Sequence, residues 1–459
     1  MYDILLWGGR VVDVHTRTSR IANLAIKDGR IACISGTDLP AGRVVDCRGL
    51  VVSPGFIDPH GHLDGHIYAG QLSALQGITT TIGGNCGLSP LDLPEFFAAQ
   101  QKQGYPIHQA EMIGHSFTLR RAVGIEDENV PATPSQVQEM ERLARKGLEA
   151  GACGVSLGLD YSPGAGEEEI LAMSRLAAEY GRTLPVHTRL FTQNDLYSLY
   201  EMFSASKKTG ARVLLSHFVY QYSGFGTMEP ALEAVDRARA SGLDIWMDTG
   251  MYTPWATYVG TATFAPETIK DLALRFGDMV VATGKYTGQT LNEELYYLLR
   301  RKYPNESVIC FTGCDDEVDA AIRKPYAMPS TDAAGYRQGE GHPQIAGSFP
   351  KYLCRVLRQK KELSLEEAVY KATLLPARTL GLPQGFGTLD EGALADITIF
   401  DPETVEDKAA FPHLGDPDAP PVGIPYVLVA GQLAVDNGQI TQSRSGKIIR
   451  YTKQGHQVL

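Results

Sequence analysis

Short apolar runs alternate with longer amphipathic segments through most of this 459-residue chain. Eight of the runs have the length and composition of buried strands, and intervening segments such as SQVQEMERLARKGLEAG have the periodicity of helices. This alternation is typical of parallel sheets. Eight such units predict an α/β fold of the TIM (β/α)8 barrel type, with its active site at the carboxyl ends of the strands. The candidate strands are VVSPGFIDPH, ITTTIGG, QAEMIGH, CGVSLG, TLPVHT, RVLLSHF, LDIWMDTGMY and YAMPSTDA.

Both ends of the chain have a different pattern, with short β-type runs separated by tight turns. The Asp-Gly pair in IKDGRIA lies between two apolar runs and predicts a hairpin. We therefore expect residues 1–50 and 388–459 to form one small β-sandwich, and residues 51–387 to form the barrel. The segment between the seventh and eighth strands is too long for one helix, which predicts a small α/β insertion at about residues 264–326.

Charge and composition narrow the class of partner. The formal net charge is −11, no basic stripe is visible, and no apolar run approaches the roughly 20 residues that cross a bilayer. Nucleic acid and membranes are therefore poor candidates, which leaves a small-molecule substrate. The seven cysteines form no CxxC pair and no secretory signal precedes them, so we expect a reduced, cytoplasmic protein. Association into a homo-oligomer stays open.

Residues that bind metals stand where five of the eight predicted strands end. A single histidine or a strand-end aspartate is often structural, but such a concentration in a chain with 11 histidines indicates a metal site. Imidazole nitrogen and thiolate sulfur are ligands that suit zinc, and a catalytic zinc leaves one position for water. The candidate ligands are His60, His62, Cys86, His187, His217 and Asp332.

The spacing of these residues suggests how they work. His60 and His62 are two residues apart, so on an extended segment both imidazoles face the same side. Glycines around Cys86 allow the backbone to bring its sulfur close to an ion, which keeps the thiol deprotonated. Asp332 is the candidate general base and acid, because a metal that activates water still needs a group to move the proton.

These residues also lie in familiar motifs. PGFIDPHGHLD resembles the first-strand signature of the amidohydrolase superfamily, and GGNCGLSP resembles its D-aminoacylase (N-acyl-D-amino-acid deacylase) branch, where a cysteine bridges the metals. Matching motifs follow in order through almost the whole chain, from GHSFTLRRAVG to GALADITIFDPETV. The resemblance implies a tight zinc site at Cys86, His187 and His217. It also implies a second, weaker site at His60 and His62, which Asp332 shares.

Two departures from that branch concern the substrate. Relatives have SHHK and HPR, whose lysine and arginine hold the substrate carboxylate, whereas this chain has Val219 and Gln344 at those positions. Neither residue can replace a salt bridge. Tyr252 matches a tyrosine near the substrate, and Arg189 and Arg337 are the nearest cations that could compensate. Tyr220 and Tyr222 add aromatic surface close by.

The sequence thus predicts a zinc-dependent amidohydrolase that cleaves a linear amide C–N bond with metal-activated water. The loss of both carboxylate-binding residues predicts that a standard N-acyl-D-amino acid is not its substrate. It also keeps open a cyclic amide or imide hydrolase, of the hydantoinase or dihydroorotase kind, or a deaminase. A metal-free scaffold is a further alternative, but the chain retains all six metal ligands.

Overall fold

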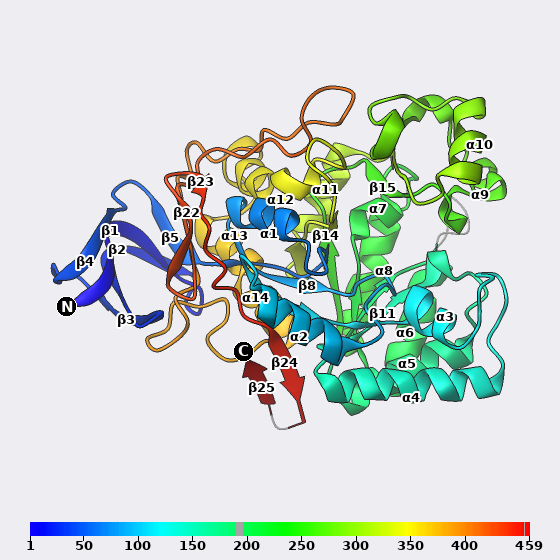
Figure 1. Cartoon of the computed structure of the whole chain (residues 1–459), viewed down its shortest axis with the longest axis horizontal. Helices are drawn as coiled ribbons and strands as arrows, with labels where there is room; N and C mark the ends of the chain where they lie inside the picture. The colour runs from blue at the N-terminus through cyan, green and yellow to red at the C-terminus, as the bar shows by residue number, and fades with distance from the viewer. Residues whose placement is uncertain (190–195, 454) are drawn as a thin grey trace.

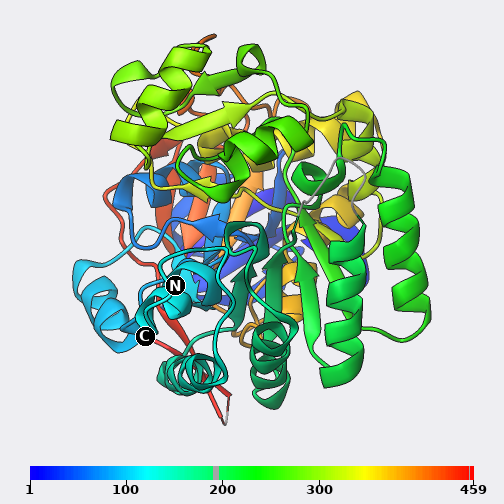
Figure 2. The ribbon, with the colours of Figure 1, turned by 90° about the vertical axis from the view of Figure 1, so that its right-hand side faces the viewer.

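A closed barrel of eight parallel strands forms the centre of the protein (Figures 1 and 2). The computed structural model describes residues 1–189, 196–453 and 455–459. Two parallel sheets, β6-β8-β9 and β10-β11-β12-β13-β14-β18, meet where β9 continues into β10. All eight predicted strands are present, which confirms the barrel. Their bounds are β6 (Phe56–Asp58), β8 (Ile78–Gly83), β9 (His108–Glu111), β10 (Ile113–Gly114), β11 (Val155–Gly158), β12 (Thr183–His187), β13 (Arg212–Leu215), β14 (Ile245–Thr249) and β18 (Ala327–Pro329).

Hydrogen bonds between the first and eighth strands close the barrel. β7 (Gly61–His62) extends the first strand and pairs in parallel with β19 (Ala333–Ala334), which extends the eighth. Beside this pair, the buried carboxylate of Asp58 accepts hydrogen bonds from the Thr331 backbone N–H at 3.0 Å and hydroxyl at 2.6 Å. Burial raises the pKa of Asp58 to about 7 despite these bonds. The closure brings two predicted site segments, around His60 and Asp332, side by side.

Helices cover the outside of the barrel because each has one apolar face. In α4 (Pro134–Ala150), Thr133 forms a capping box with Gln136, and Met140, Ala144 and Leu148 recur on the buried side. None of the described helices combines the length and apolar composition that a membrane-spanning helix needs. The other covering helices are α1 (Ile67–Leu75), α2 (Leu93–Gln103), α5 (Glu167–Glu179), α6 (Tyr197–Thr209), α8 (Met228–Ala240), α11 (Asp315–Ile322), α12 (Gln344–Leu353), α13 (Leu365–Ala372) and α14 (Leu374–Leu380).

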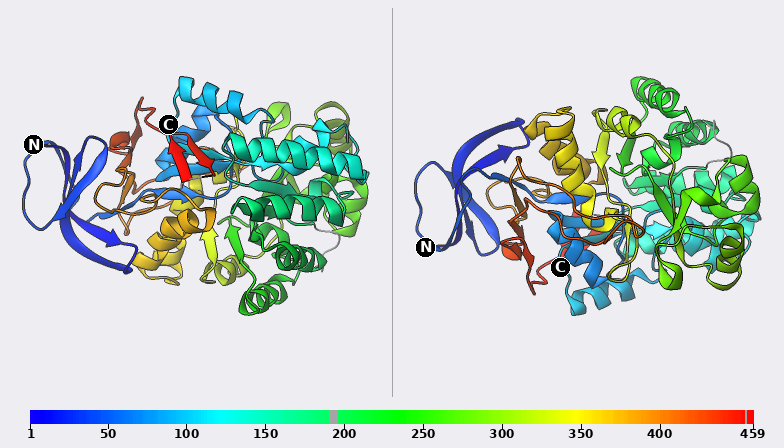
Figure 3. Two further views of the ribbon diagram at one scale, coloured as in Figure 1. Left: turned by 90° about the horizontal axis from the view of Figure 1, so that it is seen from below. Right: turned by 90° about the horizontal axis from the view of Figure 1, so that it is seen from above.

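Both ends of the chain build the β-sandwich, which lies at one end of the molecule (Figure 3). β5 pairs with β1 from the N-terminal region and with β20 from the C-terminal region, so it joins the two halves. The predicted hairpin turn has Asp28 at φ 51° and Gly29 at φ 75°, as a type I′ turn requires. The strands are β1 (Tyr2–Asp13), β2 (Thr18–Lys27), β3 (Arg30–Ser35), β4 (Ala41–Asp46), β5 (Val51–Pro54), β20 (Ile397–Phe400), β21 (Tyr426–Val429), β22 (Gln432–Asp436) and β23 (Gln439–Ile440).

The C-terminal hairpin lies apart from this sandwich. β24 (Ile449–Thr452) pairs with β25 (Gly455–Val458), and the Tyr451 N–H donates to the carbonyl of Gly151 at 3.0 Å, beyond the end of α4. The hairpin is thus fastened to the barrel. The division into residues 1–50 with 388–459 and residues 51–387 stays a prediction.

An antiparallel sheet forms the insertion between the seventh and eighth barrel strands. β15 (Trp255–Tyr258) and β16 (Met279–Val281) pair on either side of β17 (Ser307–Cys310), and α9 (Pro266–Asp271) and α10 (Glu293–Lys302) complete the unit. A separate apolar core, which includes Phe264, Leu299 and Val308, holds it together. This sheet begins before the expected start at residue 264, because β15 pairs with a strand about fifty residues later in the chain.

A buried ion pair fastens α5 to the loop after β10. Glu169 is only 2% exposed, and its carboxylate accepts hydrogen bonds from Arg120 at 2.5 Å and from the His115 ring at 3.1 Å. Burial alone would raise the pKa of Glu169. His115, the Ala132 N–H and Arg120 outweigh this effect and lower the pKa to about 2. The carboxylate is therefore ionised in the folded protein at neutral pH.

The depressed pKa predicts a dependence of stability on pH. Because the folded value of about 2 lies below the ordinary 4.5, the stabilisation by Glu169 is complete above pH 5 and is lost as the pH falls towards 2. Glu169→Gln should lower the free energy of unfolding by about 3 kcal/mol at pH 7, from that pKa difference, and by clearly less at pH 3. Urea denaturation at both pH values measures this difference.

The matched control is Glu168→Gln, which removes an exposed carboxylate one residue away. We expect it to change the free energy of unfolding by less than about 0.5 kcal/mol at either pH. An equal loss for Glu169→Gln at pH 7 and pH 3 would contradict the assignment of the pH dependence to this group.

Candidate metal centre and active site

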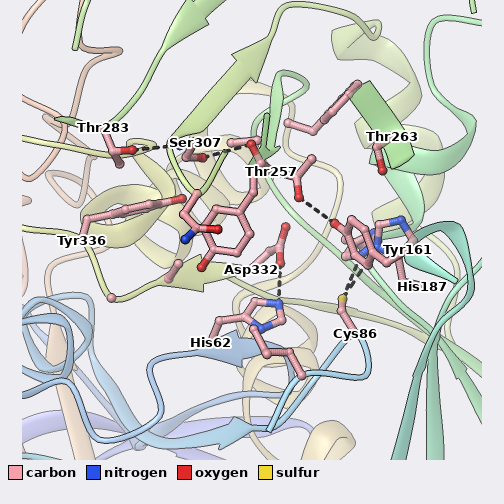
Figure 4. Close-up of a pocket in the computed structure, with 18 of the residues that line it drawn as sticks. His62, Cys86, Tyr161, His187, Thr257, Thr263, Thr283, Ser307, Asp332 and Tyr336 are labelled. Atoms are coloured by element: carbon pink, nitrogen blue, oxygen red, sulfur yellow. Dashed lines mark hydrogen bonds and ion pairs between the residues drawn. The ribbon is translucent and has the colours of Figure 1, made fainter. Parts of the chain in front are cut away.

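The six predicted ligands converge at the carboxyl ends of the barrel strands. Three sets have ligand atoms within 4.8 Å of one another, namely His60-His62-Cys86, Cys86-His187-His217 and His60-His217-Asp332. Figure 4 shows His62, Cys86, His187 and Asp332 facing the same space. The sets share members, so they form one continuous cluster.

Cys86 lies at the centre of the cluster. Its Sγ is 3.3 Å from His60 Nε2, 3.5 Å from His217 Nε2 and 3.7 Å from His187 Nδ1. Burial raises the pKa of the thiol, but these three histidines lower it more, so that the net pKa lies well below its ordinary value. Cys86 is therefore held as a thiolate, the form that binds a metal.

Asp332 is the second anion of the cluster, and its side chain is 13% exposed. Its Oδ1 is 3.2 Å from His62 Nε2 and 3.4 Å from His60 Nε2. Burial raises the pKa of Asp332, but the surrounding histidines lower it below the ordinary value. In turn, burial lowers the pKa of His62, whereas Asp332 and Cys86 raise it to about 10. The site therefore attracts positive charge.

The donor set fits a zinc ion. It combines imidazole nitrogens, a thiolate and a carboxylate, the ligands that zinc takes in proteins. A divalent cation among neutral imidazoles would supply the positive charge that the thiolate and the carboxylate attract. Of the three sets, the one that contains Cys86, His187 and His217 has all of its members buried, and it shares Cys86 with the set that contains His60 and His62.

Three of the six candidate ligands have unusual backbone conformations, which set the direction of their side chains. Cys86, His217 and Asp332 have φ values of 51°, 33° and 52°, in the left-handed region that disfavours residues with a Cβ. Such conformations cluster at functional sites. Beside Cys86, a Cβ on Gly87 would lie 2.5 Å from the Ser116 backbone nitrogen, so only glycine fits where the loops meet.

Two further carboxylates lie beside the ligand histidines, and the sequence analysis did not single them out. Asp248 ends β14 and is completely buried. Its carboxylate lies 3.3 Å from His60 Nδ1 and accepts hydrogen bonds from the His217 N–H at 2.8 Å and from Ser330 Oγ at 2.7 Å. Asp160 follows β11 and lies 3.8 Å from His187 Nε2. Such partners fix the orientation of metal-binding imidazoles. In the sequence, only the position of Asp248 and Asp160 near the ends of predicted strands could have pointed to this role.

A cavity of about 590 Å³ opens above the cluster. The insertion forms its roof, where Thr257, Thr283 and Ser307 contribute hydroxyl groups (Figure 4). The Tyr161 hydroxyl lies 3.0 Å from Thr257 Oγ1, which connects the barrel rim with the roof. The walls are largely aromatic and consist of Phe117, Tyr161, Tyr220, Trp255, Tyr258 and Tyr336.

Three of the residues predicted to contact the substrate lie outside the lining of this cavity. Val219 is completely buried, and the Tyr252 hydroxyl donates to Asp407 at 3.0 Å. Gln344 is 1% exposed, accepts a hydrogen bond from the Tyr220 hydroxyl at 3.0 Å, and donates one to the backbone carbonyl of Asp332. Tyr220 itself does line the cavity.

The two candidate cations differ in position. Arg189 lies outside the cavity lining, where its guanidinium is 3.0 Å from Glu201 and donates to the Pro163 carbonyl at 2.8 Å. Arg337 is exposed and lies at the cavity. It takes part in none of the ion pairs formed among the described residues. Arg337 is therefore the better placed of the two to meet a ligand.

Comparisons with known proteins agree with this geometry. A profile of the amidohydrolase family matches residues 51–434. The chain is 32% identical to N-acyl-D-glutamate deacylase and 30% identical to D-aminoacylase, both from Alcaligenes xylosoxydans xylosoxydans. These alignments cover 98% of this chain and 96% and 98% of the two relatives. A crystal structure of N-acyl-D-glutamate deacylase from Bordetella bronchiseptica, with zinc and a phosphonate inhibitor that mimics the tetrahedral intermediate, superposes with a TM-score of 0.86. It is 30% identical and covers 98% of this chain and 99% of that chain.

The cluster predicts a tightly bound metal. Protein purified without chelators should contain at least one equivalent of zinc, and Cys86→Ala should lose most of it, because the thiolate is shared by two of the three ligand sets. Inductively coupled plasma mass spectrometry measures the content.

Cys153→Ala is the matched control, since Cys153 is equally buried but lies at the start of β11, at the other end of the barrel. This variant should retain its zinc. Stoichiometric zinc in the Cys86→Ala protein would show that the thiolate is not a principal ligand.

Proposed function

Because this chain belongs to the amidohydrolase family, in the branch that contains the D-aminoacylases, we propose that it is a zinc-dependent hydrolase of a linear amide C–N bond. The observation that carries this proposal is the cluster of thiolate, imidazoles and carboxylate at the bottom of a cavity that the insertion roofs. The N-acyl-amino-acid deacylases it resembles act on linear amides.

Within this proposal the ligands form a tight site and a weaker one. Cys86, His187 and His217 hold the tight zinc, and His60 and His62 provide the second position, which Asp332 shares. When bound, such an ion activates water and polarises a carbonyl oxygen. The aromatic walls and the roof border the cavity on several sides, and this partial shielding from bulk water strengthens electrostatic interactions inside it.

Asp332 moves the proton. Its lowered pKa keeps it a carboxylate before reaction, so one of its oxygens can accept a proton from the attacking water. The same oxygen then donates that proton to the nitrogen that leaves. His60 and His62, within 3.4 Å, hold the carboxylate in place for both transfers.

The cyclic-amide alternative has less support. Hydantoinases resemble this chain in fold, and cyclic-amide hydrolases of this kind use a carboxylated lysine at the end of the fourth strand. Here β11 is followed by Leu159 and Asp160, and Cys86 lies where a bridging ligand is needed. The absence of the two carboxylate-binding cations is the one observation that still favours a cyclic substrate.

The cavity favours a substrate without a free carboxylate beside the scissile amide. Among the described residues that line it, Arg337 is the one arginine or lysine, and Glu306 and Glu340 lie in the same part of the lining. A carboxylate loses solvation free energy when it moves from water into the cavity. Without a cationic partner there, this loss is not recovered. We therefore propose a neutral N-acylated compound as substrate. Homo-oligomerisation and a cytoplasmic location stay predictions.

The first test of this proposal removes the base. Asp332→Asn should keep the fold and most of the zinc but lose at least roughly two orders of magnitude in turnover, because the amide cannot accept the proton. Steady-state rates of amide hydrolysis, with zinc content measured in parallel, check this. The control is Glu340→Gln, which removes another carboxylate from the cavity and should retain turnover within about threefold. Near-normal turnover by the Asp332→Asn protein would show that Asp332 does not move the proton.

The second test concerns the substrate. N-acetyl-D-amino acids should be poorer substrates than the corresponding N-acetyl-D-amino-acid carboxamides, because the free acids bring an unpaired carboxylate into the cavity. The values of kcat/KM for matched acid and carboxamide pairs decide the matter. If the free acids are better by tenfold or more, a carboxylate site exists, and Arg337→Gln then tests whether Arg337 provides it.

A further inference from the structure

Asp332 needs outside support to keep its conformation. With φ at 52°, its backbone lies in a region that disfavours a residue with a Cβ. Two hydrogen bonds hold it there. The Asp332 N–H donates to the His60 carbonyl at 2.8 Å, and its carbonyl accepts from Gln344 Nε2. The second of these bonds comes from a side chain that can be replaced without altering the barrel strands.

The Asp332 carbonyl determines which way the Gln344 amide faces, and the Tyr220 hydroxyl holds the other end of that amide. The Tyr220 hydroxyl donates to Gln344 Oε1 at 3.0 Å, and the Asp332 carbonyl can only accept. The amide oxygen must therefore face Tyr220, while its NH₂ group faces Asp332. Tyr220 is itself fixed, because it is 7% exposed and its ring stacks against His217 with centroids 5.9 Å apart.

The amide of Gln344 suits this position because it accepts from one neighbour and donates to the other. A glutamate at residue 344 would place a carboxylate against the Asp332 carbonyl and could not donate to it when ionised. An arginine could donate to the carbonyl and to the Tyr220 oxygen, whereas an amide can donate to the carbonyl and also accept from the hydroxyl. Gln344 does both, and its side chain lies outside the lining of the cavity. The residue that replaces the arginine of related deacylases thus has a different task.

We propose that Gln344 is a positioning residue for Asp332, and that the Tyr220 hydroxyl holds its amide in place for that task. The inference rests on the proposed role of Asp332 as the group that moves the proton. Gln344 holds the Asp332 backbone so that the carboxylate stays between His60 and His62. Because Gln344 does not reach the substrate space, its loss affects the rate of reaction and not substrate binding.

The test compares Gln344→Ala and Gln344→Glu with the unaltered protein, on N-acetyl-D-methionine and its carboxamide. Both variants should keep their zinc and lose at least tenfold in kcat, with KM changed by less than threefold. Tyr220→Phe should lower kcat as well, and should add little when combined with Gln344→Ala, because both changes break the same chain of hydrogen bonds. A crystal structure of Gln344→Ala should show Asp332 displaced from its left-handed conformation.

Ser348→Ala is the matched control. Ser348 is buried on the same helix, and its hydroxyl donates to the Gln344 carbonyl at 3.1 Å, so the variant tests the general effect of a lost polar contact on α12. Its kcat should stay within twofold of normal. Additive effects of Tyr220→Phe and Gln344→Ala, or a kcat for Gln344→Ala within twofold of normal, would overturn the inference.

Failure of this inference differs from failure of the proposed function. If Asp332→Asn abolishes turnover but Gln344→Ala does not, only the positioning role is wrong. If neither probe is hydrolysed by the unaltered protein, the linear-amide function is wrong for these compounds. The crystal structure of Gln344→Ala then decides the inference, and an Asp332 that keeps its conformation would overturn it.

Discussion

Two anions, the buried Cys86 and the partly exposed Asp332, determine the character of this active site. The thiolate of Cys86 and the carboxylate of Asp332 lie among histidines at the end of a barrel, where an isolated charge would be strongly destabilised. The site therefore requires positive charge, and a divalent cation supplies it. Barrel closure is the structural condition, because the two anions follow different strands and meet only when the first and eighth strands pair.

A second layer of polar residues keeps the first in place. Asp248 contacts two of the ligand segments and Asp160 faces His187, so the imidazoles are oriented before any ion binds. Gln344 and Tyr220 extend this support to the backbone of Asp332. Left-handed residues in three ligand segments show that the site is held by its surroundings and not by local backbone preference.

Sequence reasoning could predict the barrel strands and the convergence of the candidate metal ligands, because strand order and strand-end position follow from local patterns. It could not predict which side chains face the cavity. Val219 and Tyr252 are turned away, and the roof residues come from an insertion that folds through pairing between distant segments. Asp248 was missed because an aspartate after a strand is equally typical of a turn. The sequence shows that Gln344 stands where relatives have an arginine. Its hydrogen bonds to Tyr220 and Asp332 could not be predicted, because they depend on contacts between distant segments.

The most direct test of the central claim is anomalous diffraction at the zinc absorption edge from crystals of the unaltered protein. This account predicts a strong peak within bonding distance of Cys86, His187 and His217, with any second peak beside His60, His62 and Asp332. No peak in the cluster after growth with added zinc, or a peak bound by other residues while these six side chains stay in mutual contact, would contradict it.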